Sequence, residues 1–407
     1  MHHCPSIFAC VALASLLAAC NHHVQPKQEL QKGTYGHDLA LLKKNTRVSC
    51  ELYDSSGLSR VLLCADYEGR VMTSTAAGDS GNSFGWLNET LIASGQKKRS
   101  FNPYGGEERF WLGPEGGQFS IYFKKGDSFN IGHWQVPALL DTVAYHLVSA
   151  DASQAEFSKE ARIVNYSGTP FDIAIRRRIR LLQRKDIEER LHISLPTGLR
   201  FVGYESVNQV RNQGKDTWGR ENGLLSIWLL GMMTPTDATQ VIIPFHPGPD
   251  SRSYITDNYF GSIPPDRLMV GDSVLFFRCD GRFRSKIGLS PRIAKPMAAS
   301  FDFKRNILTL VLPQVYPDSL YVNSKWEIQQ RPFAGDVINS YNDGPLADGS
   351  QLGPFYEVES SSPARELRPG EAEEYSQATC HFQGDYLALK ALVFQLLKVD
   401  LDTLKKW

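Results

Sequence analysis

The stretch of residues 102–118 combines the side chains of a binding pocket with the residues of two rigid turns. Its two Gly-Gly pairs and two prolines favour turn geometry. A short strand over residues 109–112 is expected between these turns. Because side chains alternate along a strand, Glu107, Arg109 and Trp111 are predicted to share one face. An acid, a guanidinium and an indole together could bind a polar ligand; the alternative is a tight hairpin with a surface ion pair.

A second constellation places two acids on one strand face near the C-terminus. Glu357 and Glu359 are two residues apart, so their carboxylates are neighbours, and such a pair repels unless one is protonated or a cation lies between them. The pair could do general acid–base work, hold a structural Ca²⁺ with Asn342 and Asp343, or lie solvated on an edge strand. Arg109 is the expected cation, because its planar fork can bind a carboxylate through two hydrogen bonds.

A third polar group has the composition of a saccharide site. Asn323 and Trp326 lie in one short run, and residues 339–344 add amides, a tyrosine and an acid. The apolar face of a pyranose stacks on an indole, while its hydroxyls bond to amides and carboxylates. Surface loops share this composition, so the group indicates a sugar site only together with the acids.

Charge and cysteine usage exclude some classes of function. Lys and Arg total 44 and Asp and Glu total 44, so no basic face is expected and nucleic acid is an unlikely partner. After residue 20 the cysteines are Cys50, Cys64, Cys279 and Cys380, and none lies in a metal-binding spacing. They are predicted to be buried thiols, with a Cys50–Cys64 disulfide as the alternative. No metal site and no cofactor are predicted beyond the Ca²⁺ alternative.

The N-terminus reads as an export signal. An apolar run too short to span a bilayer ends in Leu17-Ala18-Ala19-Cys20, which resembles the bacterial lipobox. That resemblance implies lipidation of Cys20 and a membrane partner, and Asn21 after it implies the outer membrane of a bacterial cell envelope. An ordinary secretory signal is the alternative. We therefore expect a signal peptide over residues 1–19, a lipidated tether over 20–36 and a single domain over 37–407.

The domain that positions these groups is predicted to be mostly β. Residues 171–181 alternate between apolar and basic side chains, with Arg177 on the apolar face, either paired by a buried acid or aimed into a cavity. Helices are expected over residues 136–148, 185–191 and, with an amphipathic pattern, 385–404. No linker divides the chain, so one large sandwich of antiparallel sheets is predicted. Further strands are expected at residues 48–53, 60–65, 161–166, 200–210, 224–230, 239–245, 273–277, 301–303, 307–312 and 356–359.

The C-terminal motif resembles a known family. Glu357-Val-Glu-Ser-Ser-Ser-Pro363, followed by Leu367-Arg-Pro-Gly-Glu371, is similar to the corresponding part of aldose 1-epimerases, the galactose mutarotases. The resemblance implies a mutarotase-like β-super-sandwich in which Glu359 takes the proton of the anomeric hydroxyl. The run 102–106 resembles that family's turn, but has Tyr104 where the family places a histidine. His246 and His133 are the remaining candidates for the missing imidazole.

A closer resemblance is to a bacterial lipoprotein family of unknown function with this fold. It covers nearly the whole mature chain, through the runs 106–118, 133–137, 223–228, 321–327 and 339–345. We expect an envelope-anchored carbohydrate-binding or carbohydrate-active protein. The alternatives are a glycan-binding lipoprotein without catalysis, a polysaccharide lyase with Tyr104 and Arg109, and a structural envelope protein. The residues predicted to take part are Glu359, Arg109 and His246 in catalysis, and Tyr104, Trp111, Glu115, Arg177, Asn323, Trp326, Asn342, Asp343 and Glu357 in substrate binding.

Overall fold

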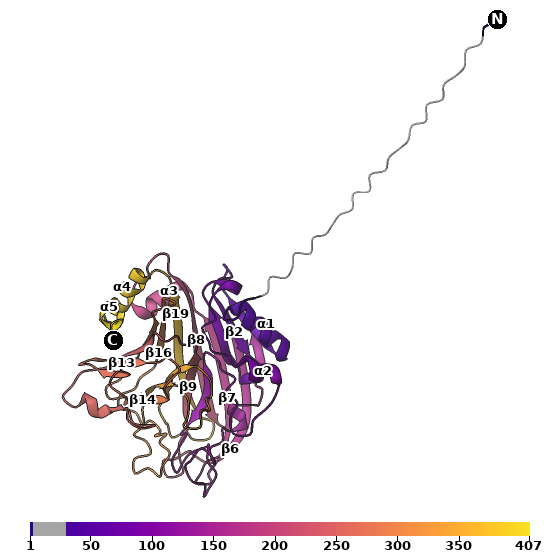
Figure 1. Ribbon diagram of the computed structural model, residues 1–407. Coiled ribbons are helices and arrows are strands. Elements are labelled where there is room, and N and C mark those ends of the chain that lie inside the picture. The colour runs from indigo at the N-terminus through magenta and orange to yellow at the C-terminus, as the bar shows by residue number, and fades with distance from the viewer. Residues whose placement is uncertain (3–29) are drawn as a thin grey trace.

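The computed structural model describes residues 1–2 and 30–407 (Figure 1). The predicted signal segment and Cys20 lie outside the described residues. In the described part, 19 strands form three antiparallel sheets. A small sheet has the order β1 (Ser49–Tyr53), β2 (Arg60–Cys64), β3 (Arg70–Thr75).

The largest sheet forms one layer of the molecule. Its ten strands lie in the order β12 (Leu268–Val270), β13 (Val274–Arg278), β10 (Thr239–Pro244), β15 (Ala298–Asp302), β16 (Ile307–Pro313), β19 (Ala372–Gln383), β8 (Arg200–Asn212), β7 (Pro170–Leu181), β6 (Gln154–Val164), β5 (His146–Ala150). Alternation along β7 and β8 produces the predicted pattern of buried and exposed side chains.

The six-stranded sheet forms the other layer. Its order is β11 (Ile255–Thr256), β14 (Ser285–Leu289), β17 (Ile338–Asn342), β18 (Tyr356–Ser361), β9 (Ser226–Met233), β4 (Arg109–Gly113). One face of this sheet, with Ile287, Ile338 and Val358, packs on Val241 and Phe277 of the ten-stranded sheet in one apolar cluster. The opposite face is the one that carries Glu357 and Glu359.

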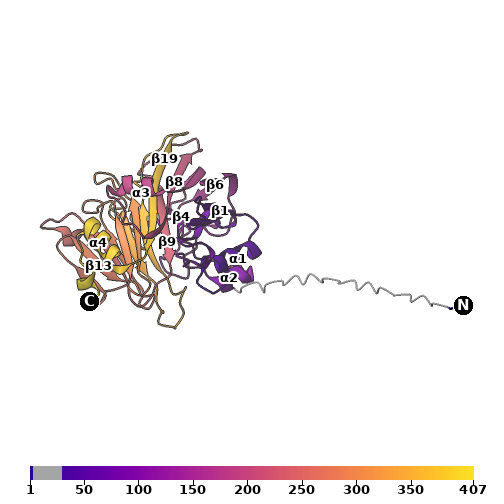
Figure 2. The ribbon, with the colours of Figure 1, turned by 90° about the horizontal axis from the view of Figure 1, so that it is seen from above.

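Helices cover the outside of the two layers (Figures 1 and 2). Leu308, Cys380 and Phe382 of the ten-stranded sheet form an apolar cluster with the C-terminal helices, while α1 and α2 lie at the opposite side of the molecule in both views. None of the helices in the described part is long and apolar enough to cross a membrane. Their bounds are α1 (Tyr35–Asn45), α2 (Glu89–Ser94), α3 (Arg184–Leu191), α4 (Tyr386–Leu397) and α5 (Leu401–Leu404).

The predicted fold class is confirmed, and the helix predictions were right in part. The helix expected over residues 185–191 forms as α3, and the C-terminal helix forms but breaks at Lys398, whose φ of 58° is left-handed. The helix expected over residues 136–148 was wrong: only a short 3₁₀ turn, Ala138–Leu140, forms before β5 begins at His146. The helix α1 was not predicted, and its first residue, Tyr35, is completely buried although the tether was expected to reach residue 36.

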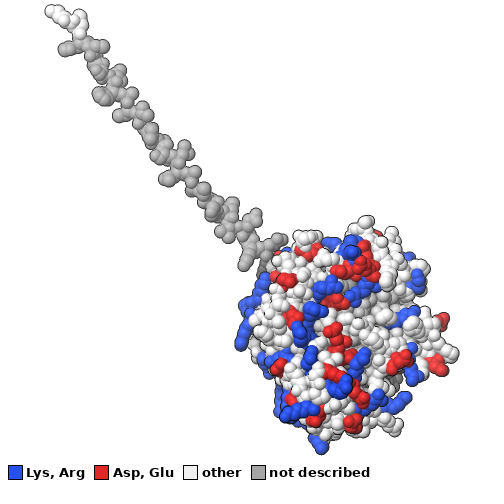
Figure 3. Space-filling model, turned by 180° about the vertical axis from the view of Figure 1, so that it is seen from behind, with Lys and Arg blue, Asp and Glu red and all other residues white. Residues whose placement is uncertain are grey.

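The cysteines and surface charges agree with the sequence. Cys50, Cys64, Cys279 and Cys380 are free thiols, and all except Cys50 are buried. On the face shown in Figure 3, basic and acidic side chains are interspersed without a large patch of one sign. This distribution fits the even charge balance of the sequence.

Candidate functional site

The face of the six-stranded sheet opposite to the ten-stranded sheet carries a buried cluster of paired charges. Glu359 on β18 is level with Leu230 on β9, which is level with Arg109 on β4. On the other side of β18, Glu357 is level with Tyr341 on β17, which is level with Lys286 on β14. Because side chains two residues apart share a face, these registers bring two acids and two cations together. We call Arg109, Lys286, Glu357 and Glu359 the charge cluster.

Each acid of the charge cluster has its own cation. Arg109 Nη2 donates to Glu357 Oε1, and Lys286 Nζ lies 2.8 Å from Glu359 Oε2. Arg109 was predicted as the cation for this pair of acids, and it does pair with Glu357; a second cation that was not predicted, Lys286, pairs with Glu359. The β18 strand also lies inside its sheet, between β17 and β9, which excludes the solvated edge strand. Arg109 and Lys286 provide the positive charge beside Glu357 and Glu359 that the Ca²⁺ alternative assigned to a bound ion.

One carboxylate oxygen of Glu359 accepts hydrogen bonds from the protein, and the other has no partner in the described chain. Trp228 Nε1 donates to Oε2 at 3.0 Å, so Oε2 accepts from both the indole and Lys286. Oε1 is buried and has no hydrogen-bond partner among the described residues. A buried carboxylate oxygen without a partner is costly, so the arrangement points to a ligand that donates a hydrogen bond there.

Aromatic rings enclose the charge cluster. The guanidinium of Arg109 lies 4.7 Å from the ring centre of Trp111, and Lys286 Nζ lies 5.0 Å from that of Trp228. Trp111 and Trp228 meet edge to face at 5.6 Å. Trp134 and Trp326 stack at 6.0 Å, and both are only partly buried. Flat indoles beside hydrogen-bonding groups are the surfaces on which a sugar ring stacks.

Several buried donors in this region also lack partners within the described chain. They are Arg109 Nε and Nη1 and the indole Nε1 atoms of Trp111 and Trp134. Together with Glu359 Oε1, they provide four N–H donors and one acceptor. A ligand with several hydroxyl or ring oxygens could satisfy this set, because each hydroxyl both accepts and donates.

Glu115 joins the cluster from the turn that follows β4. Its backbone N–H donates to Ser324 Oγ at 3.2 Å, which fixes the turn against the loop that carries Trp326. Burial raises the pKa of the Glu115 carboxyl; Glu359 adds to the rise, and Lys286 opposes it. Unlike Glu357 and Glu359, Glu115 keeps part of its surface exposed. It is therefore a partly exposed residue whose carboxyl holds its proton more tightly than in water.

Burial and neighbouring charges shift the pKa values of Glu357 and Lys286. Burial raises the pKa of Glu357 to about 7; Arg109 opposes the rise and Glu359 adds to it. For Lys286, burial acts to lower the pKa, but Glu359 and Glu115 outweigh it and the pKa lies above its usual value. Lys286 therefore stays charged next to Glu359.

Other predicted site residues lie elsewhere. Arg177 is completely buried between the layers, where Nη2 contacts Glu108 Oε1 at 2.8 Å and Nη1 donates to Asn208, which settles the earlier alternative in favour of pairing. Tyr104 is buried against Tyr67, with a pKa raised by burial to about 12. His246 lies exposed after β10, a strand of the other sheet. The structure does not bring these three side chains to the charge cluster.

Three predicted ligand-binding residues build loops instead. Asn342 Oδ1 accepts from Gly281 N at 2.8 Å, and Asp343 Oδ1 accepts from the Tyr341 hydroxyl at 2.6 Å. Asn323 Oδ1 accepts from Lys325 N at 3.1 Å within its own turn. These amides and this carboxylate form hydrogen bonds within the protein rather than with a ligand.

The face predicted for residue 107 was also wrong. The strand β4 begins only at Arg109, and Glu107 turns into the interlayer core, where its Oε1 lies 2.7 Å from His381 Nε2. It therefore does not share the face of Arg109 and Trp111. The two Gly residues before it, both with positive φ, change the chain direction at this point.

Two members of the site were missed from the sequence. Lys286 stands next to buried Ile287 in a short, otherwise buried strand, and a lone lysine in such a strand is a signal for a buried charge partner. Trp228 lies in a run that was noted for its family resemblance, but nothing local marks its indole as a donor to Glu359.

Comparisons with known proteins place this architecture in a family. The sequence profile of a family of unknown function, DUF6786, matches residues 33–407. The chain belongs to the DUF6786 family. No curated protein matches its sequence. This result confirms the predicted membership of an unknown-function family.

Solved structures show which fold this DUF6786 member has. A protein from Escherichia coli K12 assigned as an aldose 1-epimerase superposes with a TM-score of 0.50 at 10% identity, covering 83% of this chain and 100% of the other. A galactose mutarotase-like protein from Lactobacillus casei gives a TM-score of 0.47 at 10% identity, with 82% and 100% covered. At such low identity the similarity shows the fold alone. The fold is thus galactose mutarotase-like, as predicted.

Proposed function

We propose that this protein binds a saccharide on the outer face of the six-stranded sheet and catalyses acid–base exchange at its anomeric centre. The observation that carries the proposal is Glu359, whose Oε2 is held by Lys286 and Trp228 while the buried Oε1 has no partner in the described chain. A general base must be within hydrogen-bond reach of the proton that it removes, and its geometry must be fixed. The mutarotase-like fold supports a carbohydrate as the ligand.

The chemistry follows from the two kinds of acid in the site. Glu359 Oε1 would accept the proton of the anomeric hydroxyl, and the charge of Lys286 favours the ionised base before the transfer. An acid would then give a proton to the ring oxygen, so that the ring C–O bond breaks and an open-chain carbonyl forms. Rotation and reclosure by the reverse steps yield the other anomer, and both protons return to their donors.

Glu115 is the group that we assign as the acid. The histidine that the family resemblance led us to seek has no counterpart here, since His246 lies away from the charge cluster. Glu115 has a raised pKa, is partly exposed and lies near Lys286 and Glu359. A buried carboxyl with a raised pKa holds its proton more readily than a free one, as a proton donor must.

The test is the rate of anomer exchange, measured by NMR on freshly dissolved aldoses, with glycan-array binding on the same protein. Glu359→Gln keeps the shape and removes the base, so exchange should fall by about 10²–10⁴ while binding remains. Glu189→Gln, an exposed acid on α3, is the matched control and should leave exchange unchanged. Equal exchange rates in parent and Glu359→Gln would refute the base assignment.

A second candidate function is glycan binding without turnover. It is favoured by the extent to which the structure covers the charge cluster: only 1% of Glu359 and 2% of Arg109 are exposed. Specific binding on the array without exchange on any aldose would favour this candidate. The lyase alternative loses support, because Tyr104, its proposed base, is buried against Tyr67 with a raised pKa.

Placement of this function in the bacterial envelope remains part of the proposal. The lipobox-like sequence ending at Cys20 supports a lipid anchor, and Asn21 supports the outer membrane. A bound saccharide would then be captured at the membrane surface.

A further inference from the structure

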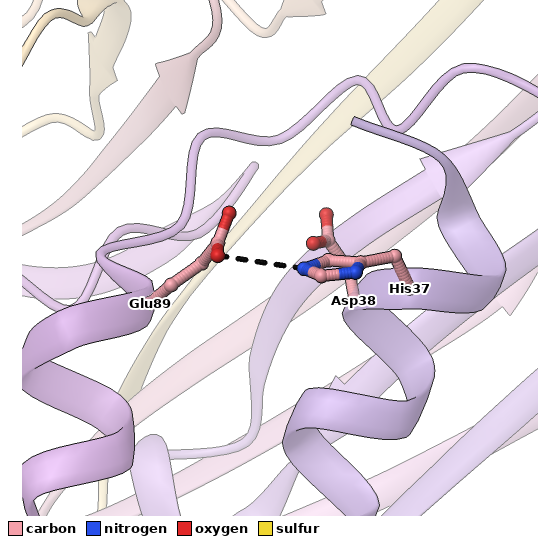
Figure 4. Close-up of side chains that lie close together, drawn as sticks. All are labelled: His37, Asp38 and Glu89. Atoms are coloured by element: carbon pink, nitrogen blue, oxygen red, sulfur yellow. Dashed lines mark hydrogen bonds and ion pairs between the residues drawn. The ribbon is translucent and has the colours of Figure 1, made fainter. Parts of the chain in front are cut away.

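A cluster of three metal-type side chains lies where α1 meets α2. His37 and Asp38 come from the first turns of α1, and Glu89 is the first residue of α2. One ligand atom from each lies within 4.8 Å of the other two. Figure 4 shows the carboxylate of Glu89 facing the imidazole of His37, with the carboxylate of Asp38 beside the ring. We propose that these three side chains bind a divalent transition-metal ion of the Zn²⁺ type.

The separation of His37 and Glu89 fits ligands better than a hydrogen bond. His37 Nε2 lies 3.4 Å from Glu89 Oε2, whereas a charge-assisted N–H···O bond measures about 2.7–2.9 Å. Two ligands that bind Zn²⁺ tetrahedrally at about 2.0–2.1 Å are separated by roughly 3.3–3.4 Å. The pair is therefore spaced like two neighbouring corners of a zinc site.

The other ring nitrogen of His37 is held as in metal sites. His37 Nδ1 lies 3.3 Å from the carbonyl oxygen of Leu30. A proton on Nδ1 donated to this carbonyl leaves the Nε2 lone pair directed at two carboxylates. A histidine ligand commonly donates its second N–H to a backbone carbonyl, which fixes the tautomer and orients the ring.

Asp38 supplies a buried carboxylate with an oxygen to spare. The residue is only 5% exposed. Its Oδ2 accepts from Ser83 Oγ, which in turn lies 2.6 Å from Thr73 Oγ1. Its Oδ1 has no hydrogen-bond partner among the described residues. The hydroxyl chain orients the carboxylate, and a cation would compensate its burial.

The ligand set selects the class of metal. One imidazole and two carboxylates suit Zn²⁺ and its neighbours in the first transition row, while Ca²⁺ prefers six to eight oxygens. Lys32 Nζ contacts Glu89 Oε1 at 3.0 Å but is highly exposed, and it leaves Oε2 available. Three protein ligands leave a fourth position for water. Bound metal would join α1 to α2, so it would stabilise the folded state.

Thermal unfolding of the chelator-treated full chain, with and without Zn²⁺, tests the proposal. Histidines and cysteines before residue 30 also bind Zn²⁺, but the midpoint rises only for metal that favours the folded state. At a hundredfold excess over Kd, Zn²⁺ should raise the midpoint by about 2–5 °C, and Ca²⁺ should not. His37→Gln and Glu89→Gln should lose this rise, while His146→Gln, an exposed histidine on β5, should keep it.

Each shift is measured within one variant, so a lower starting stability does not hide the result. The absence of a rise in the parent, or an equal rise in His37→Gln and Glu89→Gln, would overturn the site. Visible absorption of bound Co²⁺ provides a second readout, in which metal held before residue 30 contributes equally to every variant: a parent spectrum stronger than those of both variants supports the site, and equal spectra refute it. The site is formed by elements other than those of the charge cluster and does not depend on the proposed function.

Discussion

The ion pair of Lys286 and Glu359 is the contact on which the proposed chemistry rests. Glu359 is almost completely buried, and the Lys286 side chain is 12% exposed. Removing one partner of a buried pair leaves the other charge without compensation, which costs more than the pair contributes when intact. The pair therefore positions the base and also couples the site to the stability of the fold.

Lys286→Met should lower the free energy of unfolding by about 3–5 kcal/mol. The matched control is Lys304→Met, which removes the exposed pair with Asp237, and there we expect no measurable loss, because solvent screens exposed charges. Urea unfolding of the three proteins gives both values. Similar small losses in both variants would show that Glu359 is compensated by another group.

A pH dependence follows from Glu357. Burial raises its pKa from 4.5 to about 7, so between these values the folded state keeps a proton that the unfolded chain has lost. The contribution of this group to stability is then fully present below about pH 4.5 and is lost as the pH rises through 7. Glu357→Gln should reduce the fall in unfolding free energy between pH 5 and pH 8, whereas Glu189→Gln should not. An unchanged fall in Glu357→Gln would contradict the raised pKa.

Single residues show how far the sequence could predict the site. Spacing along one strand was enough to put Glu357 and Glu359 together, because the period of a strand is fixed. The cation that pairs with Glu359 was harder to predict. Lys286 and Glu359 are 73 residues apart in the sequence, and only the strand order of the sheet makes them neighbours. The prediction for Glu107 failed because the chain bends there and β4 begins only at Arg109, so the alternation does not extend back to residue 107.

At the scale of elements, regular apolar periodicity was the reliable signal. The alternation in β7 and the helical spacing in α4 both correspond to observed elements. No α-helix forms in residues 136–148; Pro137 caps a single 3₁₀ turn, Ala138–Leu140, which places Leu139 and Leu140 in the core. An irregular segment with buried side chains can have the same composition as a helix. Here tertiary contacts, not local helix propensity, determined the backbone conformation. The short α1 and α2 had too weak a pattern to be predicted.

The helix α4 allows a matched pair of substitutions. Leu389 is completely buried against the ten-stranded sheet, while Leu387 on the same helix is 70% exposed. Leu389→Ala should lower the unfolding free energy by about 2–5 kcal/mol, because it removes packed methyl groups and leaves a cavity. Leu387→Ala should change it by less than about 0.5 kcal/mol. Comparable losses in calorimetry would show that α4 is not docked as described.

At the scale of the whole molecule, the protein is a two-layered sandwich in which the charge cluster, the C-terminal helices and α1 lie in different regions. The charge cluster lies on the face of the six-stranded sheet opposite to the ten-stranded sheet, the C-terminal helices cover the ten-stranded sheet, and α1 lies on the side of the molecule opposite to them (Figure 1). This arrangement suits a protein held at a membrane surface, provided that the N-terminal segment is lipidated.

Lipidation of Cys20 is therefore the prediction that concerns the molecule as a whole. Cys20 follows Leu17-Ala18-Ala19, and an acyl chain contributes about 0.8 kcal/mol for each CH₂ that enters the bilayer, so that two or more chains give stable anchoring. In a bacterial host, Cys20→Ser should move the protein from the detergent phase to the aqueous phase on phase partitioning, or leave it unprocessed. Cys10→Ser, within the apolar run, is the matched control and should stay in the detergent phase. If Cys20→Ser partitions like the parent, the anchor is not at Cys20, and the envelope placement would need another attachment.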